Sequence, residues 1–291
     1  MKDLNILFKE YDFNFTDESV QSSVKEILAN NFAKNNNKDV YCKCLALIDL
    51  TSLNATDTEE KIEKMMLNVN DFPQHFDIPN VPAVCVFPSL VPIARKTLNG
   101  KIKIAAVSAC FPTSQTFIEA KIAETALTAL AGADEIDVVI SLGTFLSGNY
   151  NKVLEELEEI KAACRNAHLK VIIESGSLPS CADIKKASII SIAAGADFIK
   201  TSTGKTEPAA TLEAAFVMCQ TIKELYRKSG VKIGFKPAGG IATAKDVVEF
   251  YTIVEHILGE EWLNADLLRF GASRLANDLL TKIYDKNISY F

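Results

Sequence analysis

Apolar and polar residues alternate along most of the chain in a regular succession of two kinds of segment. Short runs of β-branched and other apolar residues predict strands, and longer stretches with apolar positions three or four residues apart predict helices. Strand-like runs occur at 43–49, 81–88, 102–109, 135–141, 169–175, 197–202, 231–238 and 267–272. Helical patterns follow them at 57–69, 91–98, 114–131, 150–166, 181–194, 211–229, 243–258 and 273–286.

This succession predicts an α/β fold with parallel strands, because each helix carries the chain back across the sheet before the next strand begins. Eight such units in about 250 residues match the (β/α)8 barrel, or TIM barrel. A doubly wound open sheet is the structural alternative. No linker divides the repeats, so we expect one barrel domain over 41–291.

The first 40 residues differ from the rest and are expected to form an N-terminal helical extension and a linker. The segment "FTDESVQSSVKEILANNF" predicts an amphipathic helix with Thr16 or Asp17 as its N-cap. The Asn-rich segment 30–40, "NNFAKNNNKDV", predicts the linker. The helix would cover the bottom of the barrel or build a contact in a homodimer.

Composition and charge exclude several classes of function. With 48% hydrophobic residues and a net charge of −6, the chain has material for a large core but no electrostatic footprint for nucleic acid or an anionic membrane. No apolar run reaches the roughly 18–20 residues of a membrane span, and the start of the chain lacks the pattern of a secretory signal. The seven cysteines are odd in number and lie mostly in apolar runs, so we expect reduced thiols and a cytoplasmic protein.

Metal or Ser-His-Asp chemistry is not expected. The chain has only three histidines, His75, His168 and His256, and they lie far apart. Cys42 and Cys44 have no second cysteine or histidine pair to complete a metal site. We therefore expect no metal and no cofactor.

Charged residues inside the predicted strands are the strongest chemical signal. Asp49, Asp137, Lys200 and Lys236 each lie in or at the end of such a strand, and active sites of this fold lie at the carboxyl ends of the strands. Alternation along the strands places both lysines inside the barrel on neighbouring strands. A lysine at a strand end is more often a solvated rim residue, and a strand aspartate is often half of a structural ion pair.

Two inward lysines that face an aspartate favour chemistry over this structural interpretation. An ammonium beside another ammonium in a desolvated pocket has a lowered pKa, and the neutral amine can attack a carbonyl to form a Schiff base. Asp137 is placed to move the protons that imine formation requires.

The segment "DFIKTSTGKT" raises the question of a nucleotide-binding loop, since it ends in Gly204-Lys205-Thr206. A P-loop requires a second glycine five residues before Gly204, where Ile199 stands, so the nucleotide interpretation fails. Glycine-rich loops nevertheless follow the last three strands, at 203–205, 238–240 and 270–273. Such loops can bind phosphate through backbone N–H groups, with Lys205 as a point charge, although a Gly-Gly pair after a strand can also be a simple turn.

Together these segments resemble the deoxyribose-phosphate aldolase family of class I, Schiff-base aldolases. The resemblance runs from about residue 43 to 280. The motifs that carry it are "DLTSLN", "VCVFPSLVPIARKTL", "GADEIDVVI", "LKVIIESG", "AGADFIKTSTGK", "GFKPAGGI" and "RFGAS". The family implies reversible cleavage of 2-deoxy-D-ribose 5-phosphate to D-glyceraldehyde 3-phosphate and acetaldehyde, a phosphorylated small-molecule substrate and no metal.

The resemblance implies a role for each matching residue. Lys200 is expected to be the Schiff-base lysine, Lys236 the lysine that lowers its pKa, and Asp137 the proton relay. The residues expected to bind the substrate or its phosphate are Thr203, Gly204, Lys205, Gly239, Gly240, Ser273, Thr51, Asp49 and Cys85.

The chain departs from the family pattern at two positions of the phosphate site. Arg274 stands where many relatives have a second serine, and Ala242 stands where relatives of this branch often have an arginine. We hypothesise that Arg274 replaces that arginine. Tyr290 in the C-terminal "ISYF" is a weak candidate for a tail residue that reaches the site. A catalytically silent relative and a different class I sugar-phosphate aldolase are the rival interpretations.

Overall fold

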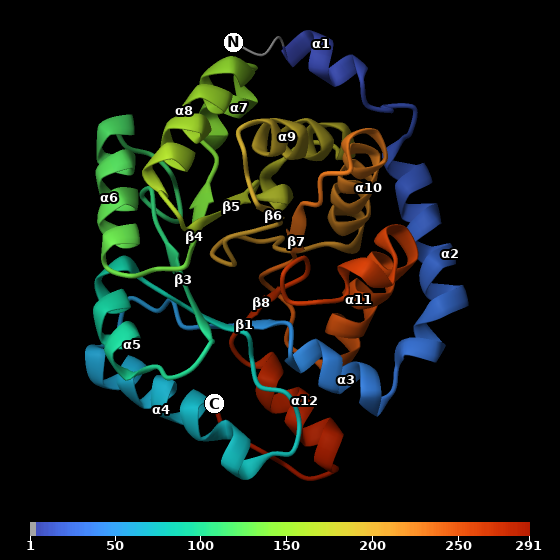
Figure 1. Ribbon diagram of the computed structural model, residues 1–291. Coiled ribbons are helices and arrows are strands. Elements are labelled where there is room, and N and C mark those ends of the chain that lie inside the picture. Colours follow the sequence, from blue (N-terminus) through green and yellow to red (C-terminus); the bar gives the residue numbers. More distant parts are fainter. Residues whose placement is uncertain (1–3) are drawn as a thin grey trace.

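The computed structural model describes residues 4–291, and its central element is a sheet of eight parallel strands (Figure 1). The strands are β1 (Ile48–Thr51), β2 (Ala83–Val86), β3 (Lys103–Val107), β4 (Glu135–Val139), β5 (His168–Ile172), β6 (Phe198–Lys200), β7 (Gly234–Lys236) and β8 (Phe270–Ala272). Their order in the sheet is β7-β6-β5-β4-β3-β2-β1-β8. The sheet therefore follows the chain order, apart from β8, which lies beside β1.

Contacts between β7 and the segment around β8 close the sheet into a barrel. Phe235 pairs with Leu268, and Ala238 pairs with Gly271, through parallel bridges. The N–H group of Phe235 donates to the Leu267 carbonyl at 2.8 Å. A doubly wound sheet would keep two free edges, so this closure excludes the open-sheet alternative and confirms the TIM barrel.

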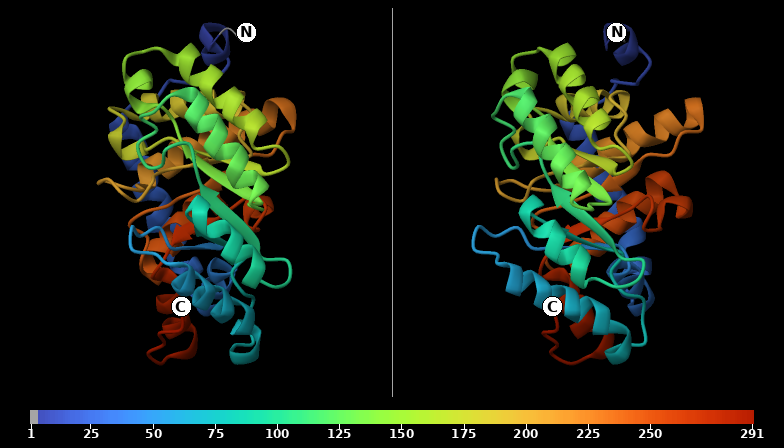
Figure 2. Two further views of the ribbon diagram at one scale, coloured as in Figure 1. Left: turned by 90° about the vertical axis from the view of Figure 1, so that its left-hand side faces the viewer. Right: turned by 60° about the vertical axis from the view of Figure 1, so that its left-hand side comes forward.

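Helices surround the barrel on its outside (Figures 1 and 2). After β1 they are α4 (Glu59–His75), α5 (Val91–Thr97), α6 (Ile118–Leu130), α7 (Leu142–Leu146), α8 (Tyr150–Ala163), α9 (Cys181–Ala193), α10 (Leu212–Ser229), α11 (Ala244–Leu258) and α12 (Leu275–Tyr284). The short 3-10 helices are η1 (Pro88–Leu90), η2 (Ser175–Ser177) and η3 (Glu260–Trp262). Thr58, Thr211 and Thr243 cap α4, α10 and α11, because each hydroxyl accepts an N–H of the first turn.

The strands are buried on both faces, as a parallel sheet covered by helices requires. Every residue of β2 and β4 is buried. Side chains such as Val84, Ile104 and Ile136 pack outward against the helices in one continuous apolar core. The other face of the strands is left for the interior of the barrel, where the charged side chains lie.

The N-terminal segment is helical over most of its length. It forms α1 (Leu4–Lys9), α2 (Asp17–Asn35) and α3 (Lys38–Leu45), with Thr16 as the N-cap of α2. In Figure 1, α2 lies along the outside of α10 and α11. Buried Asn35 donates to Thr252 at 3.1 Å and to Glu255 at 2.8 Å, which fixes the end of α2 on α11.

Two local predictions were wrong. The segment 30–40 is not an extended linker, because α2 and α3 are separated only by Asn36 and Asn37, and the Asn37 side chain caps α3. The strand predicted at 43–49 begins at Ile48, because α3 includes 43–45. The first residues of the apolar run at 43–49 therefore belong to a helix and the last ones to a strand. Hydrophobicity alone does not distinguish the two.

Candidate functional site

A cavity of about 380 Å³ opens at the carboxyl ends of the strands, between the loops that follow β1, β6, β7 and β8. Most of the predicted site residues line it: Thr51, Lys200, Thr203, Gly204, Lys205, Gly239, Gly240, Ser273 and Arg274. A larger cavity of about 570 Å³ lies at the opposite end, where residues at the starts of β5 and β6 line it with mostly apolar neighbours. We assign chemistry to the smaller cavity, because it opens at the carboxyl ends of the strands and is lined by Lys200, a buried ionisable residue of the barrel interior.

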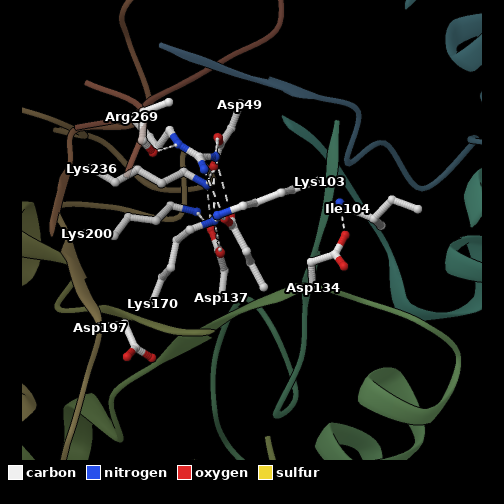
Figure 3. Close-up of polar contacts among 12 residues, drawn as sticks. Asp49, Lys103, Ile104, Asp134, Asp137, Lys170, Asp197, Lys200, Lys236 and Arg269 are labelled. Carbon is white, nitrogen blue, oxygen red and sulfur yellow. Dashed lines mark hydrogen bonds and ion pairs between the residues drawn. The ribbon is translucent and has the colours of Figure 1, made fainter. Parts of the chain in front are cut away.

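Lys200, at the floor of the cavity, shares one carboxylate oxygen with a second lysine. Lys200 and Lys236 are paired in register on β6 and β7. Their ammonium nitrogens donate to the same Oδ2 atom of Asp137 on β4, at 2.9 and 2.8 Å, respectively (Figure 3). Lys236 also lies 2.5 Å from Oδ2 of Asp49. The predicted trio is therefore in direct contact inside the barrel.

This trio belongs to a larger buried network of charges. Its members, none more than 3% exposed, are Asp49, Glu135, Asp137, Lys170, Lys200, Lys236 and Arg269. The guanidinium of Arg269 lies 2.6 Å from Oδ1 of Asp49 and 3.0 Å from Oε1 of Glu135. The ammonium of Lys170 contacts Glu135 and lies 3.1 Å from Asp49 and 3.3 Å from Oδ1 of Asp137. The network joins β1, β4, β5, β6, β7 and the residue before β8.

The charge balance of the network favours the loss of a proton from one of its lysines. If all seven groups were ionised, four cations would face three anions, and an uncompensated buried charge is costly. Lys236 and Lys170 each contact two or more carboxylates, whereas Lys200 contacts only that of Asp137. Loss of the Lys200 proton gives an equal number of positive and negative groups.

The pKa shifts follow the same logic. Burial lowers the pKa of Lys200, and the Lys236 ammonium lowers it further, against the opposing effect of Asp137. Burial would also lower the pKa of Lys236, but the carboxylates of Asp137 and Asp49 outweigh it and raise that pKa. Burial likewise opposes the charge of Asp137, yet Lys170, Lys200 and Lys236 hold its pKa well below the usual range. The site thus holds an ionised aspartate between Lys200, whose pKa is lowered, and Lys236, whose pKa is raised.

Sequence reasoning missed Glu135, Lys170 and Arg269. Glu135 is the first residue of β4, Arg269 precedes β8 and Lys170 lies in the middle of β5, whereas site residues were expected near the carboxyl ends of the strands. A signal was available, since Glu135 is two residues before Asp137 and so shares its side of the strand. Lys170 interrupts an apolar run in the same way.

The loops of the cavity rim have the backbone geometry that the glycines predicted. Gly204 and Gly239 have φ values of +74° and +85°, in the left-handed region that favours glycine. A Cβ atom on Gly239 would lie 2.7 Å from Cβ of Ala209 and 2.9 Å from Cα of Gly204. The loops after β6 and β7 therefore pack backbone to backbone, and only glycine fits between them.

Two cationic residues line this rim. The ammonium of Lys205 donates to the carbonyl of Leu53, in the loop after β1, which also lines the cavity. Ser273 and Arg274 line it where α12 begins. Ala242 also lines the cavity, without a charge of its own. A helix start and two cations form a suitable site for a phosphate group.

The remaining predicted residues occupy different places. Asp49 and Cys85 are fully buried and do not line the cavity. Cys85 packs with Leu53 and Val107 in a small apolar cluster. Tyr290 contacts α4 and α12: its hydroxyl donates to the Asn68 carbonyl at 2.8 Å, and its N–H group donates to the Asn277 side chain at 2.8 Å.

Two further findings concern residues 4–291 as a whole. No helix in this range is long and apolar enough to cross a membrane. The same residues contain no group of three or more histidine, cysteine, aspartate or glutamate side chains arranged to hold a metal ion.

Comparisons with known proteins identify the family of the chain. A family model described as DeoC/LacD family aldolase matches residues 43–257. The deoxyribose-phosphate aldolase of Homo sapiens is 40% identical over 255 residues, which cover 83% of this chain and 80% of the human one. That of Mus musculus is 39% identical over the same length and the same shares of both chains.

Solved structures show the same architecture. An aldolase named QR15 is 31% identical, with a TM-score of 0.68, and the match covers 83% of this chain and 98% of that one. A deoxyribose phosphate aldolase from Aeropyrum pernix, described as tetrameric, has a TM-score of 0.67 at 24% identity, which supports the fold. With the family match spanning most of the chain and the barrel built as its members are, the chain belongs to the DeoC/LacD family of aldolases.

Proposed function

We propose that the protein cleaves 2-deoxy-D-ribose 5-phosphate reversibly to D-glyceraldehyde 3-phosphate and acetaldehyde, with Lys200 as the Schiff-base nucleophile. The observation that carries the proposal is the single oxygen of Asp137 that binds both Lys200 and Lys236, with Lys200 lining a cavity that has a cationic rim. The relatives named deoxyribose-phosphate aldolase support the choice of substrate.

Imine formation is the first step. The neutral amine of Lys200 attacks C1 of the open-chain sugar, and the resulting carbinolamine loses its hydroxyl group as water. Asp137 accepts hydrogen bonds from both lysines, so it can take a proton from the Lys200 side and return one through Lys236. The cationic iminium then takes the place of an ammonium in the network.

Carbon–carbon cleavage uses the iminium as the electron acceptor. The C3 hydroxyl loses its proton while the C2–C3 bond breaks, and the electron pair of that bond moves towards the iminium nitrogen to give an enamine. C3 becomes the aldehyde carbon of glyceraldehyde 3-phosphate. Protonation of the enamine at C2 and hydrolysis of the imine then release acetaldehyde and restore Lys200.

The rim holds the other end of the substrate. Lys205 and Arg274 provide positive charge, and the start of α12 with the glycine loops provides backbone N–H groups for the phosphate. Lys200 and Lys205 belong to one short segment, so the reacting carbon and the phosphate are positioned by the same piece of chain. A fixed separation between the two ends favours a five-carbon sugar phosphate.

Borohydride trapping tests the proposal directly. The protein is incubated with 2-deoxyribose 5-phosphate or with acetaldehyde, reduced with borohydride and mapped by mass spectrometry, while release of glyceraldehyde 3-phosphate is followed with a coupled dehydrogenase. We expect an N-ethyl group on Lys200 after acetaldehyde treatment and no adduct in Lys200→Leu. Absence of an adduct on Lys200 in the unaltered protein would overturn the mechanism.

The same experiment separates the rival functions. A catalytically silent relative would give neither an adduct nor a product. A different class I aldolase would give an adduct at Lys200 only with another sugar phosphate. Cleavage of 2-deoxyribose 5-phosphate together with the adduct excludes both.

We also propose that the reaction needs no metal, because the iminium supplies the electron withdrawal that a metal would otherwise provide; retention of activity in a chelator tests this. The seven cysteines are free thiols in the structure, which supports a cytoplasmic location.

We propose a homodimer and a division into a 1–40 extension and a 41–291 barrel domain. Light scattering of the full chain and of a chain that begins at residue 41 tests both.

A further inference from the structure

The short segment after β5 lies directly beneath the loop that follows β6. The N–H group of Ser175 donates to the carbonyl of Thr201 at 2.9 Å. A Cβ atom on Gly176 would lie 1.8 Å from the carbonyl oxygen of Pro208, so the two backbones are in contact there. The loop that carries Thr203, Gly204 and Lys205 thus rests on η2 at both of its ends.

Glu174, the residue before η2, binds this loop through its carboxylate. Oε1 accepts the N–H group of Thr203 at 3.0 Å, and Oε2 accepts the Thr203 hydroxyl at 2.6 Å. The Thr203 oxygen in turn accepts the N–H group of Lys205 at 3.1 Å, which sets the turn at Gly204. A chain of hydrogen bonds therefore runs from Glu174 to the backbone of Lys205.

The burial of Glu174 indicates that its contact with Thr203 has a functional role. The side chain is 2% exposed, and within the described residues it forms no ion pair. A buried carboxylate is costly unless its oxygens accept hydrogen bonds, and here Thr203 provides both donors. Glu174 is bound to the phosphate rim, since Thr203 lines the cavity, and among the described residues it has no hydrogen bond or ion pair with a member of the lysine network.

We propose that Glu174 is a positioning residue for the phosphate of the substrate. It fixes Thr203 and, through Thr203, the turn that presents Gly204 and Lys205 to the cavity. This inference rests on the proposed function, which it deepens: Glu174 controls how strongly the enzyme prefers phosphorylated over unphosphorylated sugar. It has no part in the chemistry at Lys200.

The test compares two substrates in matched variants. Glu174→Gln keeps the shape of the side chain but offers one acceptor oxygen to two donors. We expect KM for 2-deoxyribose 5-phosphate to rise about tenfold, with kcat changed less than twofold. The kcat/KM for unphosphorylated 2-deoxyribose should stay within twofold. An equal loss on both substrates would overturn the proposal, since it would indicate general damage.

Changes at Thr203 keep the proposal testable if Glu174→Gln folds poorly. Thr203→Val removes the hydroxyl at nearly constant volume and should reproduce the loss on the phosphorylated substrate, whereas Thr203→Ser should retain normal KM. A Thr203→Ser variant as impaired as Thr203→Val would contradict the proposed hydrogen-bond chain.

Glu156→Gln is the control, because Glu156 accepts bonds from Lys121 and Ser141 away from the rim. Its substrate preference should match that of the unaltered protein, and a shift like that of Glu174→Gln would overturn the proposal. Failure of the proposed function is distinguishable from failure of this inference, because the unaltered protein would then give no cleavage of 2-deoxyribose 5-phosphate.

Discussion

Removal of the Lys236 charge should raise the pKa of Lys200, and the structure sets the size of the effect. The two ammonium nitrogens lie 2.9 and 2.8 Å from one oxygen of Asp137, so they are at most about 5.7 Å apart. Two unit charges at that separation repel by about 3 kcal/mol at an effective dielectric constant of about 20. This energy corresponds to about two pKa units.

The variant Lys236→Met removes this repulsion. It also removes the lysine that shares Oδ2 of Asp137 with Lys200, so that this oxygen interacts more strongly with Lys200. Both effects raise the pKa of Lys200. The sign of the pH dependence follows. A higher pKa lowers the fraction of neutral amine at a given pH, by at most about 100-fold for two units, and the lost activity returns as the pH rises towards the new pKa.

The assay is the pH profile of kcat/KM for 2-deoxyribose 5-phosphate between pH 6 and 10, with the rate of borohydride trapping measured in parallel. We expect the rise in activity on the acidic side of the profile to move to higher pH by about two units. Lys121→Met, which removes a buried lysine paired with Glu156 elsewhere, should leave the profile in place. A uniform loss at every pH, with an unmoved profile, would refute the electrostatic reasoning.

Three further predictions concern the rim and the C-terminal tail. Arg274→Ser should raise KM for 2-deoxyribose 5-phosphate several-fold without affecting unphosphorylated 2-deoxyribose; an unchanged KM contradicts phosphate binding by Arg274. Gly239→Ala should lower the free energy of unfolding by about 1–3 kcal/mol and raise the same KM, because a Cβ atom would meet Ala209 at 2.7 Å; denaturant titration and initial rates check both. Tyr290→Phe removes the hydrogen bond to Asn68 and should cost about 1 kcal/mol of stability, read as a melting temperature lower by a few degrees. An unchanged melting temperature would show that the tail is not held there.

The sequence predicted the barrel and the central trio because both depend on strong, local patterns. The alternation of apolar strands and amphipathic helices determines the layers, and a charged residue such as Lys200 at the end of an apolar strand stands out from its neighbours. The elements that were missed are weakly patterned. The helices α1 and α7 have six and five residues, too few for a helical period to be visible.

The buried network could not be assembled from sequence for a different reason. Arg269 and Glu135 are 134 residues apart, and their contact depends on the closure of the barrel and on its stagger. A search of single strands finds each charge but not its partners. Glu174 is harder still, since it follows its strand with a left-handed backbone, φ +50°, that its sequence does not suggest.

The contact between Lys205 and the Leu53 carbonyl has a consequence for turnover. Because this ammonium donates to a carbonyl of the protein itself, an arriving phosphate must displace that carbonyl and gains only the difference between the two bonds. The departing glyceraldehyde 3-phosphate is helped for the same reason, because the carbonyl takes the cation back as the product leaves. The contact thereby lowers the affinity of the rim for a phosphate group and speeds the release of the phosphorylated product. This suits an enzyme that catalyses its reaction in both directions.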